Sequence, residues 1–287
     1  MKLKSWLAYA LITTVFWGVW GALIEIPEKA GFPATLGYIV WSLTMIIPAI
    51  VALKIINWKL ETNKKAILYG LLIGISGSAG QLILFQALRT GPAYLVFPIV
   101  SLSPLVTILL SLLYLKEKAS AKSWIGIVIA IMAFPLLSYQ SSGNDQEFGF
   151  FWIILALAVF LLWGTQAYFM KVANKHIKAE SIFVYMMISG LGLIPVALFI
   201  TDFRQEINWG FKGPYFTAAI QVLNSIGALF LVYAFRYGKA IIVSPLANAG
   251  APVITIILSL IIYGVFPNTI ILIGMLLAII AIFLLAD

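Results

Sequence analysis

Apolar residues run through this chain in long stretches that are separated by short clusters of charged residues. Eight stretches contain no Asp, Glu, Lys, Arg or His, and each is 20 to 26 residues long: 5–24, 30–53, 66–88, 90–115, 123–144, 148–170, 181–201 and 213–235. About 20 apolar residues carry a helix across the ~30 Å hydrocarbon core of a bilayer. Each stretch therefore predicts one membrane-spanning helix.

The last uncharged stretch, residues 240–286, is 47 residues long and exceeds what one spanning helix needs. Its middle reads Tyr263-Gly264-Val265-Phe266-Pro267-Asn268, in which Gly, Pro and Asn are turn residues. We therefore expect two helices here. The expected fold is an all-α integral membrane protein with ten transmembrane helices.

Composition agrees with a protein that lies in lipid. Hydrophobic residues make up 63% of the 287 and charged residues only 10%, too few to cover the surface of a soluble domain. The net charge of +8 is divided among short clusters rather than gathered in one patch, so we expect no nucleic-acid partner. The chain has no cysteine, and no pattern in it predicts a metal or a cofactor.

A membrane enzyme would need clustered acids, histidines or metal ligands. The only histidine, His176, lies between Lys175 and Lys178 in a segment that reads as a solvated loop. Asp145 and Glu147 form an isolated acidic pair. We therefore expect that the protein is not an enzyme.

Lysine and arginine fall unequally on the two sides of the predicted bundle. With the N-terminus inside, the inner side receives fourteen of them: Lys2, Lys4, Lys54, Lys59, Lys64, Lys65, Lys116, Lys118, Lys122, Lys171, Lys175, Lys178, Arg236 and Lys239. The outer side receives four: Lys29, Arg89, Arg204 and Lys212. The excess of positive charge on cytoplasmic loops predicts cytoplasmic termini and a multi-pass protein of the plasma or inner membrane.

The second half of the sequence repeats the first. Trp17-Gly18 recurs as Trp163-Gly164, at an offset of 146 residues. At an offset of 147, Ser78, Gly80, Leu84, Ala87, Arg89, Gly91, Ala93, Val96 and Pro98 match Ser225, Gly227, Leu231, Ala234, Arg236, Gly238, Ala240, Val243 and Pro245. At an offset of 148, Pro104, Thr107, Ser111, Gly126 and Ala130 match Pro252, Thr255, Ser259, Gly274 and Ala278. We therefore divide the chain into two repeats, residues 1–144 and 145–287.

Each repeat contains five spans, and five is odd, so the second repeat enters the membrane from the opposite face. An inverted pair of five-helix units is a common transporter plan, because exchanging the conformations of the two units exchanges the open side. The duplication therefore favours transport over other functions of a membrane protein.

Several of these motifs carry a resemblance to a known family. The Trp-Gly pairs, Ala-Leu-Arg-Thr-Gly-Pro-Ala at 87–93 and Ala-Phe-Arg-Tyr-Gly-Lys-Ala at 234–240 resemble the drug/metabolite transporter superfamily, EamA type, over essentially the whole chain. Leu102-Ser103-Pro104-Leu105, continuing to Leu115-Lys116-Glu117, is similar to the fourth helix of that family. The second half departs from the pattern, with Val265-Phe266 where the glutamate would recur. The resemblance implies ten helices and carriage of amino acids, metabolites, sugars or drugs.

Matched prolines mark the fourth and ninth spans as candidate binding helices. Pro98 and Pro104 lie in the fourth span, and Pro245 and Pro252 lie at matching places in the ninth. Proline removes a backbone hydrogen bond, and the freed carbonyl needs a partner in lipid. Paired interrupted helices point to a central substrate site, although prolines also merely kink transmembrane helices. Polar side chains lie between these prolines: Ser101, Ser103 and Asn248.

Other polar and aromatic residues within the spans are candidates for the same cavity. The amides Gln81, Gln166 and Asn224 either line the cavity or bond neighbouring helices. The aromatic candidates Trp17, Tyr94 and Trp163 either line it or belong to an interfacial belt.

Three further charged residues stand at the ends of spans. Glu25, at the outer end of the first span, is the one candidate for proton coupling, with a solvated loop residue as the alternative. Arg89 and Arg236 each precede a glycine by two residues, which predicts helix capping more than substrate contact.

The sequence therefore predicts a secondary active transporter that moves a small organic metabolite by alternating access. A passive channel or facilitator for small solutes is the alternative, and a membrane-embedded enzyme comes after it. The expected partners are the lipid bilayer, the small-molecule substrate, and either a proton or an exchanged solute. Monomer and homodimer both stay open.

Overall fold

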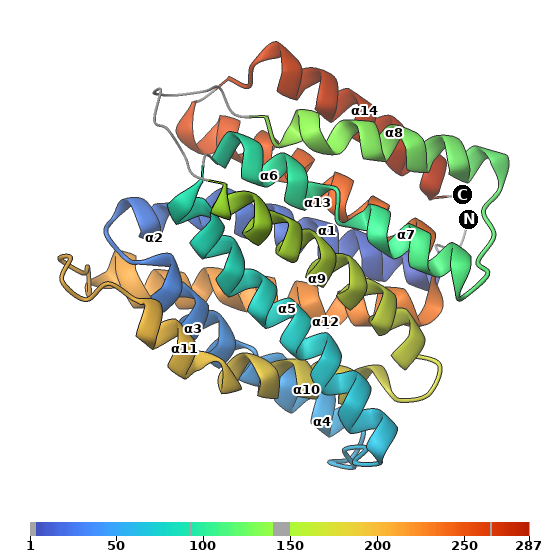
Figure 1. The fold of residues 1–287 in the computed structure, drawn as a ribbon, viewed down its shortest axis with the longest axis horizontal. Coiled ribbons are helices and arrows are strands. Elements are labelled where there is room, and N and C mark those ends of the chain that lie inside the picture. Colours follow the sequence, from blue (N-terminus) through green and yellow to red (C-terminus); the bar gives the residue numbers. More distant parts are fainter. Residues whose placement is uncertain (1–3, 92, 140–149, 265, 287) are drawn as a thin grey trace.

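A computed structural model of the chain describes residues 4–91, 93–139, 150–264 and 266–286, without the side chains of 93–95 and 98. These residues are helical almost throughout (Figure 1). The first half contains α1 (Ser5–Leu23), α2 (Glu25–Lys29), α3 (Ala34–Thr44), α4 (Ile46–Ile55), α5 (Lys64–Thr90), α6 (Ala93–Ser101), α7 (Pro104–Leu113) and α8 (Ala121–Leu137). The second half contains α9 (Phe151–Ala173), α10 (Ala179–Gly192), α11 (Ile194–Ile200), the π-type turn η1 (Phe211–Tyr215), α12 (Phe216–Tyr237), α13 (Ala240–Tyr263) and α14 (Thr269–Leu285).

The helices follow the apolar stretches of the sequence. Within the described residues, seven helices or helix pairs are long and apolar enough to cross a membrane, and three shorter apolar helices cover 99–113, 121–137 and 269–285. The expected division of the last stretch is confirmed. The helix α13 ends at Gly264, whose φ of 65° is left-handed, and the Asn268 side chain caps α14 by accepting from the Ile271 amide.

Only one of the two proline-bearing spans is interrupted. The fourth span breaks at residues 102–103 into α6 and α7, and Pro104 begins α7. The expectation of a matching interruption in the ninth span is wrong, because α13 continues through Pro245 and Pro252. Eleven of the fourteen residues of α13 from Ala240 to Val253 are buried among other helices, Pro245 included. Such enclosure is the condition under which a transmembrane helix tolerates proline.

The two repeats pack on each other through equivalent helices. The first helix of the chain, α1, packs along α12 and α13, while α9, the first helix of the second half, packs along α5 and α7. In Figure 1, α1 runs away from the end of the molecule that holds both termini, and α9 runs toward it. The helices α8 and α14 pack on each other beside this bundle.

Small residues allow this close packing. A Cβ on Gly227 would lie 2.6 Å from Cδ1 of Trp17, and a Cβ on Gly80 would lie 2.5 Å from Nε1 of Trp163. Each repeat therefore provides a tryptophan and a glycine, and the tryptophan of one lies on the glycine of the other.

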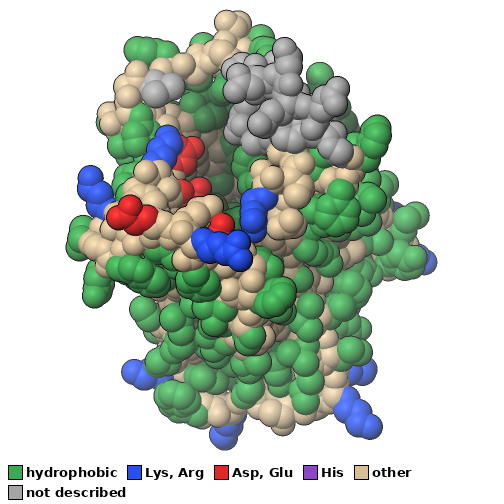
Figure 2. All heavy atoms as spheres, turned by 60° about the vertical axis from the view of Figure 1, so that its left-hand side comes forward, with side chains coloured by type: hydrophobic (Ala, Val, Ile, Leu, Met, Phe, Trp, Pro, Cys, Tyr) green, Lys and Arg blue, Asp and Glu red, His purple; other side chains and the backbone are tan. Residues whose placement is uncertain are grey.

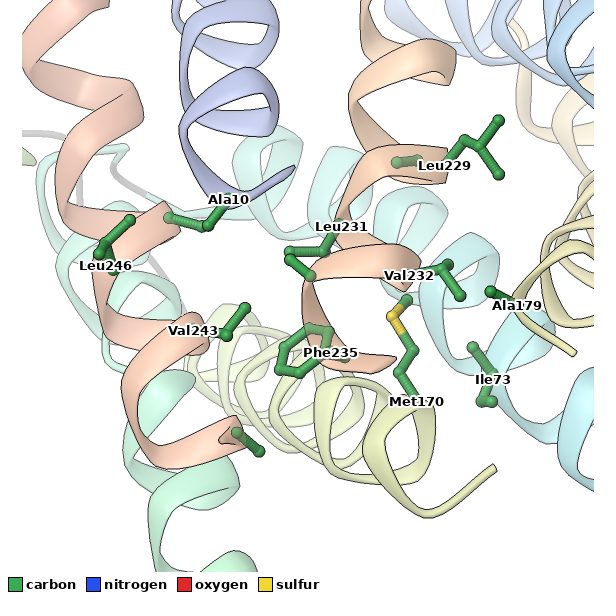
Figure 3. Packing of buried hydrophobic residues seen from close by; sticks show 14 of the residues in the cluster. Ala10, Ile73, Met170, Ala179, Leu229, Leu231, Val232, Phe235, Val243 and Leu246 are labelled. Carbon is green, nitrogen blue, oxygen red and sulfur yellow. The ribbon is translucent and has the colours of Figure 1, made fainter. Parts of the chain in front are cut away.

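The molecule has two ends, which we name by what lies there. The termini end holds both chain termini and the connections after α4, α7, α9 and α12, and the α2 end lies opposite (Figure 1). Part of the buried core lies at the termini end. There Phe235 and Val232 of α12 lie among Met170 of α9 and Val243 of α13, all at most 1% exposed (Figure 3).

Candidate functional site

Paired tryptophan contacts hold α1 to α12 and α9 to α5. Trp17 donates from Nε1 to the Asn224 carbonyl at 3.3 Å. Trp163 donates from Nε1 to the Gly77 carbonyl, also at 3.3 Å. Asn224 follows Gly77 by 147 residues, the offset of this part of the repeat, so the two bonds are equivalent. Both tryptophans therefore bond a neighbouring helix through their ring nitrogens.

Threonine contacts repeat in the same way. Thr107 of α7 donates to the Gly164 carbonyl at 2.9 Å, and Thr255 of α13 donates to the Gly18 carbonyl at 3.0 Å. These bonds join the fourth and ninth spans to the Trp-Gly helices at the middle of the bundle. The sequence repeat is therefore also a repeat of contacts.

An amide cluster lies where α1 meets α12. Gln221 is 5% exposed, and its Oε1 accepts from Trp20 Nε1 at 3.0 Å and from Asn224 Nδ2 at 3.3 Å. Its Nε2 donates to the Gly37 carbonyl at 3.4 Å. This network orients the half-buried Asn224, and we call Trp20, Gln221 and Asn224 the amide cluster.

The other predicted amides lie at the α5–α9 contact. The Gln166 amide lies directly against Gly77, beside the bond that Trp163 makes to the same glycine. Gln81 follows Gly77 by one helical turn and is half-buried. The structure thus groups Gln81, Trp163 and Gln166 on one pair of helices and Trp17 with Asn224 on the other.

The predicted residues of the fourth and ninth spans lie near the centre of the bundle. Ser103 is 6% exposed, and its carbonyl lies against Gly164. Ser244, next to Pro245, approaches Thr107 at 3.5 Å between the two hydroxyls. Asn248 donates from its side chain to the Ser244 carbonyl at 2.9 Å.

The remaining predicted residues are placed less fully. Ser101 ends α6, and Pro252 follows Ala251, whose carbonyl lies against Gly18. Tyr94 and Pro98 belong to α6, but their side chains lie outside the described part of the chain. Glu25 begins α2 at the α2 end, where its Oε2 lies 2.6 Å from Lys29 Nζ.

Hydrogen bonds close the termini end. Lys171 of α9 donates to the carbonyls of Phe235, at 2.9 Å, and Gly238, both at the C-terminal end of α12. Asn174, one turn further along, donates to the Val232 carbonyl at 3.0 Å. Together with the apolar core of Figure 3, these bonds fix α9 to α12 at the termini end.

A carboxylate strengthens the same closure. Glu117, which follows α7, accepts from the Ile241 amide at 3.1 Å in the first turn of α13. Lys239 donates to the Lys118 carbonyl nearby. An acidic side chain at a helix N-terminus is stabilising, because it satisfies a free amide and complements the helix dipole.

The α2 end differs. We use "mirror residue" for the residue at the matching repeat position, so the mirror residues of Met170, Val232 and Phe235 are Ile24, Phe85 and Leu88. The first three are at most 1% exposed, whereas their mirror residues are only partly buried. Among the described residues, α1 does not pack on α5 as α9 packs on α12. Figure 2 shows this end of the molecule hollowed between charged side chains. The described helices therefore pack more tightly at the termini end than at the α2 end.

The glycines that follow the two arginines are the C-caps of α5 and α12, and their amides donate to the Ala87 and Ala234 carbonyls. Gly91 has φ −141° and Gly238 has φ −106°, so neither adopts the left-handed conformation of a capping glycine. Each arginine lies in the last turn of its helix, as the capping interpretation predicts, but the glycine after it is extended. Because Gly91 has no side chain, Trp152 packs directly against it. Trp6, the mirror residue of Trp152, packs against Gly238 in the same way.

The structure brings into the site several residues that the sequence did not assign to it. Trp20 and Gln221 complete the amide cluster, and Gln221 had a usable signal, since it precedes Asn224 by three residues on one helix face. Lys171 and Asn174 close the termini end through bonds to backbone carbonyls, which leave no pattern in a sequence.

Comparisons with known proteins agree with this architecture. Residues 4–139 and 150–286 each match the EamA-like transporter family. The chain belongs to that family. This confirms the resemblance from the sequence motifs, and with the apolar helices it makes the protein a multi-pass membrane transporter of the EamA type.

Two individual proteins extend the comparison. An uncharacterized protein of Methanocaldococcus jannaschii, MJ1333.1, is 33% identical over 131 residues, which are 46% of this chain and 94% of that protein. A protein of known crystal structure aligns with a TM-score of 0.77 at 15% identity, over 99% of this chain and 96% of its own. At that identity the second likeness concerns the fold alone.

Proposed function

We propose that this EamA-family member is a secondary active transporter that moves a small organic metabolite by alternating access. In this proposal the chain crosses the cell membrane ten times, as two inverted five-helix repeats, residues 1–144 and 145–287. The termini end faces the cytoplasm, in keeping with its excess of lysine and arginine. The half-length relative from Methanocaldococcus jannaschii supports the division, because its match is about as long as one repeat.

One observation carries the proposal: equivalent contacts hold the two repeats together at the centre, while their ends differ. The tryptophan and threonine bonds occur in both repeats, but the carbonyl bonds of Lys171 and Asn174 close only the termini end. A protein that opens alternately to two sides needs a central contact that both states share, and in each state one end is open while the other is closed. In this proposal the described helices represent an outward-open state.

The substrate site in this proposal lies at the centre, between the two groups of amides. The residues assigned to it are Trp17, Gln81, Tyr94, Pro98, Ser101, Ser103, Pro104, Trp163, Gln166, Asn224, Pro245, Asn248 and Pro252. The amide cluster supplies both donors and acceptors, and the tryptophans supply apolar faces. This chemistry suits a neutral or zwitterionic organic molecule such as an amino acid, a sugar, a nucleoside or a drug-like solute.

The test is uptake into proteoliposomes that contain the purified full chain. A panel of radiolabelled amino acids, sugars and nucleosides is offered with and without a pH gradient. A transported solute should show saturable uptake and exchange with unlabelled solute inside. Asn224→Ala and Gln166→Ala should each raise the KM, whereas Gln205→Ala, in the exposed α11–η1 connection, should leave it unchanged. Normal affinity in both central variants would reject the cavity assignment.

A passive channel is the second candidate, and the same assay separates it from a carrier. Channel flux rises in proportion to concentration and shows no exchange of labelled for unlabelled solute. Turnover of a solute into a chemically different product would indicate the membrane-enzyme alternative instead.

A further inference from the structure

A small polar pocket lies at the termini end, beside the bonds that join α9 to α12. Its volume is about 200 Å³, and it is lined by Glu61, by Arg236 of α12 and by residues 174–178, which connect α9 to α10. Pockets that hold drug-sized molecules measure about 300–1,000 Å³, so this one suits a smaller group. None of the residues assigned to the central substrate site lines it.

Two side chains of the pocket each have a buried polar atom without a partner among the described residues. One is Nη1 of Arg236, a donor, and the other is Oδ1 of Asn174, an acceptor. The amide of Asn174 is fixed in this orientation, because its Nδ2 donates to the Met170 and Val232 carbonyls at 2.9 and 3.0 Å. Since buried polar groups are nearly always hydrogen-bonded, the pocket calls for a partner that both accepts and donates.

The charge in the pocket favours an anion as that partner. The guanidinium of Arg236 stays ionised and forms no ion pair with any described residue, and Lys178 adds a second positive charge. Glu61 lines the pocket too, but its Oε2 accepts from the Lys178 amide at 2.6 Å, and no described cation pairs with it. A water molecule would supply hydrogen bonds and leave the positive charge uncompensated, whereas an anion supplies both.

The first repeat shows the same arginine position without a pocket. The mirror residue of Arg236 is Arg89, which is exposed and donates to the last carbonyl of α11 at 3.3 Å. The mirror residue of Asn174 is Glu28, whose carboxylate repels anions. The pocket therefore belongs to one end of the protein and is not part of the contacts that the two repeats share.

A phosphate group matches the two unpartnered atoms. Its oxygens accept from a guanidinium in the bidentate geometry that arginine offers. At neutral pH, inorganic phosphate keeps a hydroxyl that can donate to Oδ1 of Asn174, whereas sulfate has the same shape and no proton. In a lipid, headgroup hydroxyls beside the phosphate supply the donor. The cytoplasmic leaflet, which the termini end faces in the proposed orientation, carries anionic lipids whose headgroups bind in basic pockets between helices.

We propose that Arg236, Lys178 and Asn174 form a binding site for one phosphate group at the termini end. Arg236 and Lys178 hold the charged oxygens, and Asn174 accepts from the hydroxyl. The group belongs to free phosphate or to an anionic lipid headgroup, which present the same chemistry. Bound there, it contacts both α12 and the α9–α10 connection and adds to the bonds between α9 and α12. This site goes beyond the proposed transport function and does not depend on it.

The test is thermal melting of the purified full chain, because a ligand that binds the folded protein raises its melting temperature. In detergent, inorganic phosphate and sulfate are titrated separately at neutral pH and constant ionic strength. In nanodiscs, phosphatidylcholine alone is compared with phosphatidylcholine that contains phosphatidylglycerol, whose headgroup carries hydroxyls. A shift with inorganic phosphate identifies free phosphate as the source. A shift with phosphatidylglycerol alone identifies a lipid headgroup.

The variants assign the shift to the pocket. Arg236→Met should weaken binding of the phosphate source about ten- to hundredfold, since it removes hydrogen bonds from a charged group. Glu61→Gln should bind more tightly, because its amide oxygen still accepts from the Lys178 amide and no longer repels an anion. Lys65→Met removes an exposed charge outside the pocket, and Arg89→Met removes the mirror arginine, so both should bind as the unchanged chain does.

Three results would overturn the site. The first is that neither source shifts the unchanged chain more than it shifts Arg236→Met. The second is an equal loss in Lys65→Met or Arg89→Met, which would assign the shift to net charge. The third is a shift with sulfate as large as the shift with phosphate, which would leave Asn174 without a role. Melting without ligand shows whether each variant folds, and Arg236→Met should fold because it replaces an unpaired, partly buried charge with an apolar side chain.

Discussion

Lys171 should hold the protein in its outward-open form, and Lys171→Met removes that restraint. The ammonium makes two bonds to carbonyls at the end of α12. Hydrogen bonds from a charged group contribute about 1.5–3 kcal/mol each. Because Lys171 is only half-buried, water screens both bonds, and we take about 2 kcal/mol for the pair. At 1.4 kcal/mol per factor of ten, the termini end should open about thirty-fold more often.

A buried reporter makes this opening measurable. Val243 lies in the apolar core of the termini end and is 0% exposed, so Val243→Cys reacts with a thiol reagent only when that end opens. The labelling rate in vesicles should rise about thirty-fold when Lys171→Met is added. Lys175→Met is the matched control, since it removes an exposed charge just beyond the same helix.

Two outcomes would refute this reasoning. An unchanged labelling rate in Lys171→Met would show that its bonds do not restrain opening. An equal rise in Lys175→Met would show that net charge matters, rather than the bonds to the carbonyls.

Three other substitutions test the central contacts. Gly227→Ala should lower thermal stability by about 1–3 kcal/mol because its methyl group meets the tryptophan of α1, whereas Gly192→Ala, with nothing within 4 Å, should have little effect; equal melting temperatures would contradict the packing. Thr107→Val removes the bond that joins α7 to the Gly164 carbonyl of α9 and should cost about 0.5–1.5 kcal/mol in chemical denaturation, more than Thr165→Val, whose hydroxyl bonds only its own helix. Glu117→Gln weakens the cap on α13 by about 1 kcal/mol and should raise labelling at the termini end about five-fold, and a fall would contradict it.

The sequence predicted the helices well because lipid imposes a simple rule. A spanning helix needs a fixed length of apolar residues, so charged clusters at its ends are enough to locate it. The repeat was equally visible, since the Trp17-Gly18 and Trp163-Gly164 pairs pack against neighbouring helices in equivalent ways. Each contact needs a tryptophan or a glycine at that position.

The parts that sequence reasoning missed depend on neighbours rather than on local pattern. Proline at 245 and 252 left α13 continuous, because enclosure by other helices decides whether a proline breaks a helix. Lys171 and Asn174 bond to backbone carbonyls, which every residue has, so no sequence motif marks the acceptor. Most of the fold but only part of the candidate site was therefore predictable.

The contact between α1 and α12 also has a consequence for biosynthesis. Trp17 and its acceptor Asn224 are 207 residues apart, so the first helix enters the bilayer long before its packing partners exist. Until α12 and α13 are synthesised, α1 stands among lipids with its ring nitrogen unmatched. The core therefore assembles late in synthesis. A chain that is truncated before the ninth span lacks α13, so one side of α1 stays unpacked and accessible to cellular quality control.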